Sequence, residues 1–148
     1  MKKIVNLIVN KYNMREYGID FMGYVINNPK KLTYHHLITP KQYGGEETIE
    51  NGVVLLRYSH HYLHLIEEYD FKTFEKITKQ LIEENVNGKI DLRNLYNIHR
   101  YLLEFEKKNI HNKKIELLDI YTRRFLSAFD DDVLNNIDKY ELKKDLHL

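Results

Sequence analysis

One window of this 148-residue sequence, residues 31 to 69, carries strand, turn and helix signals in a fixed order. The stretch KLTYHHLI alternates between two faces as a strand does, and Pro40 and Gly44-Gly45 then break the chain. Asn51-Gly52 is a tight-turn signal, and the apolar run from Val53 to Leu56 is typical of a strand. The window therefore predicts two strands separated by a loop.

Five of the eight histidines lie in this window, at positions 35, 36, 60, 61 and 64. Imidazole binds borderline metals and also exchanges protons near neutral pH, so such a cluster suits both tasks. Ser59 is a suitable N-cap for a helix that continues to about Glu68. On that helix, His60 and His64 are four apart and share one face, while the three-residue spacing of His61 and His64 is an alternative.

The order of these parts resembles the HNH endonuclease family, whose active site is a ββα-metal fold. On a strand, His35 and His36 face opposite ways, which allows them different tasks. The resemblance implies that His35 is a metal ligand and that His36 is the general base that activates water. It also implies that Asn51 constrains the loop before the second strand and helps to hold the base in position.

The same resemblance implies that His60 and His64 complete the metal site, with His61 as the alternative ligand. The expected cofactor is a divalent ion, Mg²⁺, Mn²⁺, Ni²⁺ or Zn²⁺. Many family members also have cysteine pairs that bind a structural zinc, whereas this chain has no cysteine. Packing must therefore replace any scaffold role of that zinc.

The expected partner is nucleic acid, most often DNA in this family, and the family's usual setting implies a phage or mobile-element gene. The formal net charge is only +1, so local patches or a second protein would have to bring the substrate to the site. The arginines considered for phosphate contacts are Arg57, Arg93, Arg100, Arg123 and Arg124. A solvated helix face with local ion pairs explains the last four equally well.

The chain length predicts one domain, residues 1–148, of the α+β class and mostly helical. It divides into a lead-in at 1–30, which fits a helix or a strand, the HNH-like ββα motif at 31–69 and a helical C-terminal region at 70–148. Amphipathic helices are predicted from Phe71 to Asn87, after an Asp91 cap, from about Ile115 to Phe129, and after Asp130.

Two other functional interpretations remain open from the sequence. One is a catalytically silent HNH-like binding module that inhibits or regulates a host nuclease or defence system through a protein partner. The other is a three-histidine zinc hydrolase acting on a small molecule. A homodimer is compatible with each of them. No apolar stretch approaches the roughly 20 residues that span a bilayer, so no membrane association and a cytoplasmic location are expected.

Overall fold

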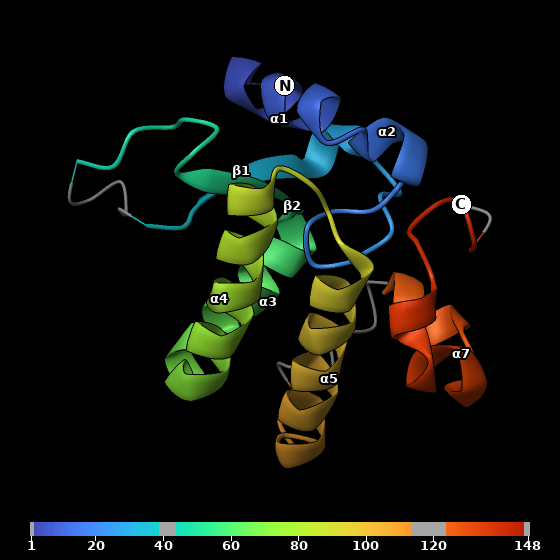
Figure 1. Ribbon diagram of the computed structural model, residues 1–148. Helices are drawn as coiled ribbons and strands as arrows, with labels where there is room; N and C mark the ends of the chain where they lie inside the picture. The colour runs from blue at the N-terminus through green and yellow to red at the C-terminus, as the bar shows by residue number, and fades with distance from the viewer. Residues whose placement is uncertain (1, 39–43, 114–123, 147–148) are drawn as a thin grey trace.

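The computed structural model describes residues 2–38, 44–113 and 124–146, and it is α+β and mostly helical, as the sequence predicts (Figure 1). Every helix in these ranges is too short or too polar to cross a lipid bilayer. The helices and strands, in chain order, are α1 (Lys3–Lys11), α2 (Met14–Tyr17), β1 (Leu32–His36), β2 (Gly52–Leu56), α3 (Arg57–Tyr69), α4 (Phe71–Asn87), α5 (Leu92–Lys108) and α7 (Asp131–Asn135). Short 3-10 turns lie at Pro29–Lys31, Phe125–Ala128 and Ile137–Lys139.

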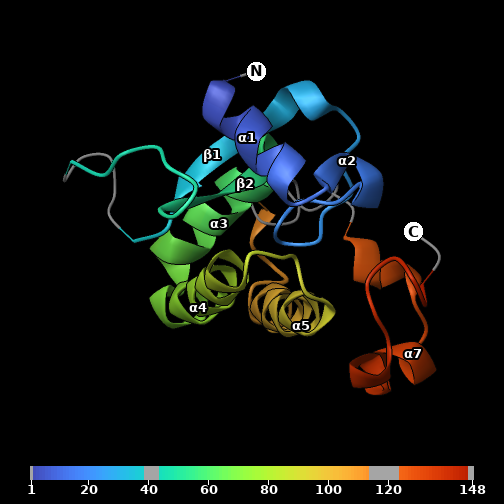
Figure 2. The same cartoon turned by 45° about the horizontal axis from the view of Figure 1, so that its top comes forward.

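The sheet is a two-stranded antiparallel pair whose register runs from Leu32 opposite Leu56 to His36 opposite Gly52. Helix α1 contacts both strands from one side and α3 contacts them from the other (Figure 2). Gly52 is the first residue of β2 rather than a turn residue, and the Tyr34 ring lies against it. A Cβ at this position would collide with that ring, so close packing, rather than a left-handed turn, requires glycine here.

The N-terminus of α3 differs from the sequence-based expectation, because the helix begins at Arg57 and Ser59 lies inside its first turn. No described side chain caps the first amides of this helix, and the junction before it is held instead by Asp20 in the lead-in, whose side chain is fully buried. Its Oδ2 accepts hydrogen bonds from the Leu56 amide at 2.9 Å and the Ser59 hydroxyl at 2.5 Å. Its Oδ1 accepts from two lead-in amides, so one carboxylate ties the lead-in to the β2–α3 junction.

Replacing Asp20 with asparagine should lower the free energy of unfolding by about 1.5–3 kcal/mol at pH 7.5, the range for hydrogen bonds to a charged group. The amide nitrogen cannot accept from Leu56, which leaves a buried donor without a partner. Urea denaturation monitored by circular dichroism measures the change. Asp132→Asn, at an exposed position of α7, is the matched control and should change stability by less than about 0.5 kcal/mol.

The pH dependence gives this prediction a second test. Burial raises the pKa of Asp20 to about 6, although four donors that favour the carboxylate oppose the shift. The folded state therefore binds this proton more tightly than the unfolded state, whose pKa is near 3.9, and the Asp20 contribution to stability falls as pH rises from about 4 to 6. The stability difference between wild type and Asp20→Asn should widen between pH 7 and pH 5. A difference independent of pH would contradict the raised pKa.

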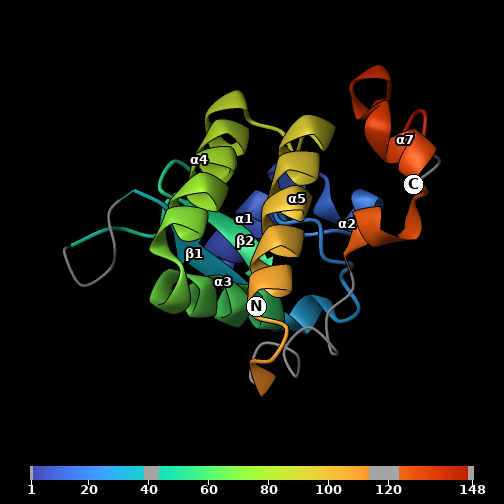
Figure 3. The same cartoon turned by 90° about the horizontal axis from the view of Figure 1, so that it is seen from below.

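Helices α4 and α5 lie side by side and form most of the layer beyond α3 (Figures 2 and 3). The predicted bounds of α4 and the predicted start of α5 are confirmed: α4 ends at Asn87 before Gly88, and Asp91 caps α5 by accepting from the Arg93 amide. The helix expected from about Ile115 to Phe129 lies partly outside the described residues. Its described end is a 3-10 turn, so the prediction of a helix continuing to Phe129 was wrong.

Candidate metal centre

Three histidines from two elements converge at the end of the sheet. His35 on β1 and His60 on α3 place Nδ1 and Nε2 3.1 Å apart, and their rings meet edge to face. The His64 ring lies one helical turn along α3, with its centroid 4.8 Å from that of His60 and 5.4 Å from that of His35. Each ring offers one nitrogen within 4.8 Å of the others, a spacing compatible with shared coordination of one ion.

The protein environment keeps two of these rings neutral, which is the protonation state that binds a metal. Burial, reinforced by the neighbouring histidines, lowers the pKa of His35 to about 3. Burial and the adjacent His64 lower the pKa of His60 to about 4. At neutral pH both rings therefore offer a lone pair without first losing a proton.

His61, the alternative ligand, is exposed and lies outside the cluster of three. Consecutive residues of a helix are separated by about 100° around its axis. His61 is therefore turned away from the face on which His60 and His64, four residues apart, lie toward β1. The register that uses His60 and His64 thus brings both side chains to His35.

We expect His60→Ala and His64→Ala each to weaken Zn²⁺ or Ni²⁺ binding by at least about 100-fold, because one of three ligands is lost. His61→Ala is the matched control and should stay within about threefold of wild type. Isothermal titration calorimetry of the full chain measures all four affinities. If His61→Ala lost more metal affinity than His60→Ala, His61 rather than His60 would be the ligand on α3.

His36 makes different contacts from His35, in agreement with the predicted alternation. Its ring packs edge to face against Tyr34, with centroids 4.8 Å apart. The half-buried ring keeps its Nε2 away from solvent, and no described group forms a hydrogen bond to this atom. His36 nevertheless borders the same cavity of about 760 Å³ as the three clustered histidines.

Asn51 fastens the segments on either side of the loop that joins the two strands. Its side-chain oxygen accepts from the Ile38 amide at 3.1 Å, and its side-chain nitrogen donates to the Glu46 carbonyl at 3.0 Å. Its own carbonyl accepts from the Leu37 amide at 2.8 Å. These contacts begin one residue after His36 and hold the end of β1 in place.

The predicted phosphate-binding arginines that the structure describes lie on different elements. Arg57 is exposed on the first turn of α3, three residues before His60. Arg100 is exposed on α5 beside the Tyr96 ring, and Arg124 forms an ion pair with Glu106 at 2.6 Å. Arg123 lies outside the described residues. Helical spacing therefore places Arg57 about one turn from His60.

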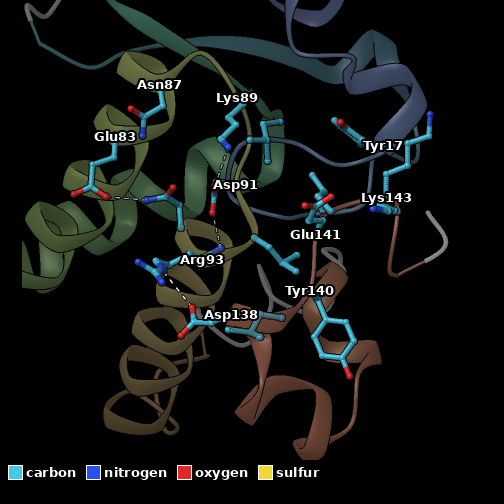
Figure 4. A pocket seen from close by; sticks show the side chains of 16 residues that line it. Tyr17, Glu83, Asn87, Lys89, Asp91, Arg93, Asp138, Tyr140, Glu141 and Lys143 are labelled. Carbon is cyan, nitrogen blue, oxygen red and sulfur yellow. Dashed lines mark hydrogen bonds and ion pairs between the residues drawn. The ribbon is translucent and has the colours of Figure 1, made fainter.

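Arg93 lies in a different and larger cavity, of about 1240 Å³, between the α4–α5 connection and the C-terminal segment (Figure 4). It pairs there with Asp138 at 3.2 Å, and Lys89 pairs with Asp91 at 3.6 Å. The described residues that line this cavity include no histidine, and their charges are largely matched. It therefore offers no concentrated positive charge for a phosphate.

The sequence reasoning missed several residues that surround the histidines. Glu47 and Glu67 line the cavity, as do Phe74 and Thr78 from α4. Nothing local to α4 indicated this role, since its apolar stripe fits a core helix equally well. Of the three histidines outside the window at residues 31 to 69, His99 is buried on α5 and His111 is exposed, while His147 lies outside the described residues.

Comparisons of the chain with protein-family models, with curated proteins and with solved structures find no match. The residues of the site are therefore the basis on which a function is proposed.

Proposed function

We propose that the protein is a metal-dependent endonuclease of the HNH type, in which β1, β2 and α3 form a ββα-metal unit. One observation carries the proposal: three imidazoles converge as a ligand set, and a fourth, His36, borders the same cavity with an unpartnered ring nitrogen. Buried titratable groups with shifted pKa values that line one cavity are typical of functional sites, which supports the proposal.

His35, His60 and His64 would hold the ion, and a divalent metal bound there would stabilise charge on the scissile phosphate and the leaving oxygen. Three protein ligands are the number found in catalytic sites that keep a further position open. His36, which borders the same cavity, would take a proton from the attacking water. Asn51 would keep the end of β1, and hence this ring, in position.

The charges around the cavity also fit a metal-dependent reaction. The described residues that line it include two carboxylates, Glu47 and Glu67, and no lysine or arginine. Lys2 pairs with Glu47 at 3.1 Å, and His64 contacts Glu67 at 3.2 Å. Because His35 and His60 are neutral, the side chains that line the cavity offer a phosphate little attraction without a cation.

A plasmid-cleavage assay with Mg²⁺, Mn²⁺, Ni²⁺ or Zn²⁺, each with and without EDTA, tests this function. Single-stranded DNA and RNA are included as alternative substrates. We expect metal-dependent nicking that EDTA abolishes and that His111→Ala, at an exposed position outside the site, leaves unchanged. Metal binding without cleavage of any substrate would contradict a nuclease and favour the binding-module interpretation.

A further inference from the structure

We propose that Thr33 is a positioning residue of the histidine cluster, because its hydroxyl holds His60 in the tautomer whose Nε2 is free to bind a metal ion. This inference rests on the metal site proposed above and assigns the group that prepares one of its ligands. Thr33 lies two residues before His35 on β1, so both side chains point toward α3.

The Thr33 hydroxyl makes two hydrogen bonds whose directions can be assigned. Oγ1 is 2.9 Å from the carbonyl oxygen of Leu55, its neighbour across the sheet, and 2.8 Å from Nδ1 of His60. A carbonyl only accepts, so the single hydroxyl hydrogen is directed to Leu55. Oγ1 must then accept from His60, which places the ring proton on Nδ1.

A neutral imidazole with its proton on Nδ1 carries its lone pair on Nε2. In His60 this atom faces the cluster, where it accepts a hydrogen bond from Nδ1 of His35 at 3.1 Å that a bound metal ion would replace. The chain from the Leu55 carbonyl through Thr33 to His60 therefore fixes both the orientation of the ring and the nitrogen that it presents. Hydrogen bonds to the distal ring nitrogen are a general way to orient metal-binding histidines.

Glu67 makes the corresponding contact to His64, with 3.2 Å between Oε1 and Nδ1, but in a different environment. The side chains of His64 and Glu67 are 52% and 43% exposed, so water can replace this hydrogen bond. Thr33 and His60 are both partly buried, where a lost acceptor is harder to replace. We therefore expect the Thr33 hydroxyl to matter more.

The test compares Thr33→Val, which keeps the shape without the hydroxyl, with Thr33→Ser, which keeps the hydroxyl. Calorimetric titration of the full chain with Zn²⁺ should give about 10- to 100-fold weaker binding for the valine variant, the range for lost hydrogen bonds to ligands. The serine variant and Glu67→Gln, whose amide oxygen still accepts, should remain within about threefold. Thermal unfolding checks that all variants fold.

A tautomer measurement separates positioning from general packing. Long-range ¹H–¹⁵N spectra of the metal-free protein should show the His60 proton on Nδ1 in wild type and Thr33→Ser, and mixed tautomers in Thr33→Val. If wild type binds Zn²⁺ and Thr33→Val binds it equally well, the role of Thr33 is overturned while the metal site stands. If wild type binds none of Mg²⁺, Mn²⁺, Ni²⁺ and Zn²⁺ in the same titration, the proposed metal site is overturned and the positioning role of Thr33 with it.

Discussion

Replacing His36 with alanine should lower the rate of phosphodiester cleavage by about 10²- to 10⁴-fold, the usual contribution of a general base. Metal affinity should stay within about threefold of wild type, because the His36 ring contacts Tyr34 and lies outside the group formed by His35, His60 and His64. Single-turnover cleavage with saturating metal measures the rate, and calorimetric titration of the same preparation measures the affinity.

Chemical rescue makes the assignment of a base more specific. Removing the ring leaves space beside Tyr34, and added imidazole should restore part of the rate as its neutral form becomes available. His61→Ala, which removes an exposed histidine from α3, is the matched control and should neither lose activity nor respond to imidazole. A His36→Ala variant that cuts at the wild-type rate would exclude His36 as the base.

The residues that could be predicted from sequence are those whose placement follows a local repeat. The strand alternation separates the contacts of His35 from those of His36, and the helical repeat selects His60 and His64 over His61. The caps and breaks of α4 and α5 are also local signals, since Asp91 and Gly88 act on the neighbouring turn. Such features need no knowledge of distant parts of the chain.

The residues that could not be predicted act across long sequence separations. Asp20 anchors the junction before α3, where Ser59 was expected to cap the helix, although 36 residues separate Asp20 from Leu56. Phe74 and Thr78 reach the histidine cavity only because α4 folds back along α3. Thr33 was overlooked for another reason, because a threonine on a strand has a common packing role and only the contact with His60 distinguishes it.

Truncating the chain after Tyr69 should abolish cooperative folding, although the fragment would retain β1, β2 and α3. The deletion removes a set of fully buried apolar side chains on or between α4 and α5: Ile77, Leu81, Ile90, Leu92, Leu95, Ile98, Leu102 and Phe105. Burial of each contributes about 1.5–3 kcal/mol, so their sum exceeds 10 kcal/mol and matches the whole stability of a typical domain.

Polar contacts from α4 to the loop and the sheet are lost as well. The side chain of Asn85 donates to the carbonyls of Ile49 and Gly52 at 2.7 and 2.9 Å, beside the residues that Asn51 fastens. Without α4 these carbonyls lose their donors, and the cavity loses the wall formed by Phe74 and Thr78. Thermal unfolding followed by circular dichroism should therefore show no cooperative transition, with dispersed amide signals absent from NMR spectra.

A truncation after Phe129 is the matched control for this experiment. It removes α7 and the final segment, in which Ile137 and Leu142 are the buried apolar residues that the structure describes. It keeps Phe125, whose amide donates to the Gly23 carbonyl at 2.6 Å and ties the lead-in to the region beyond α5. This variant should unfold cooperatively at a lower temperature than the full chain and still bind metal. A folded fragment ending at Tyr69 would show instead that the ββα unit needs no helical support, which would free the surface of the C-terminal helices for a partner.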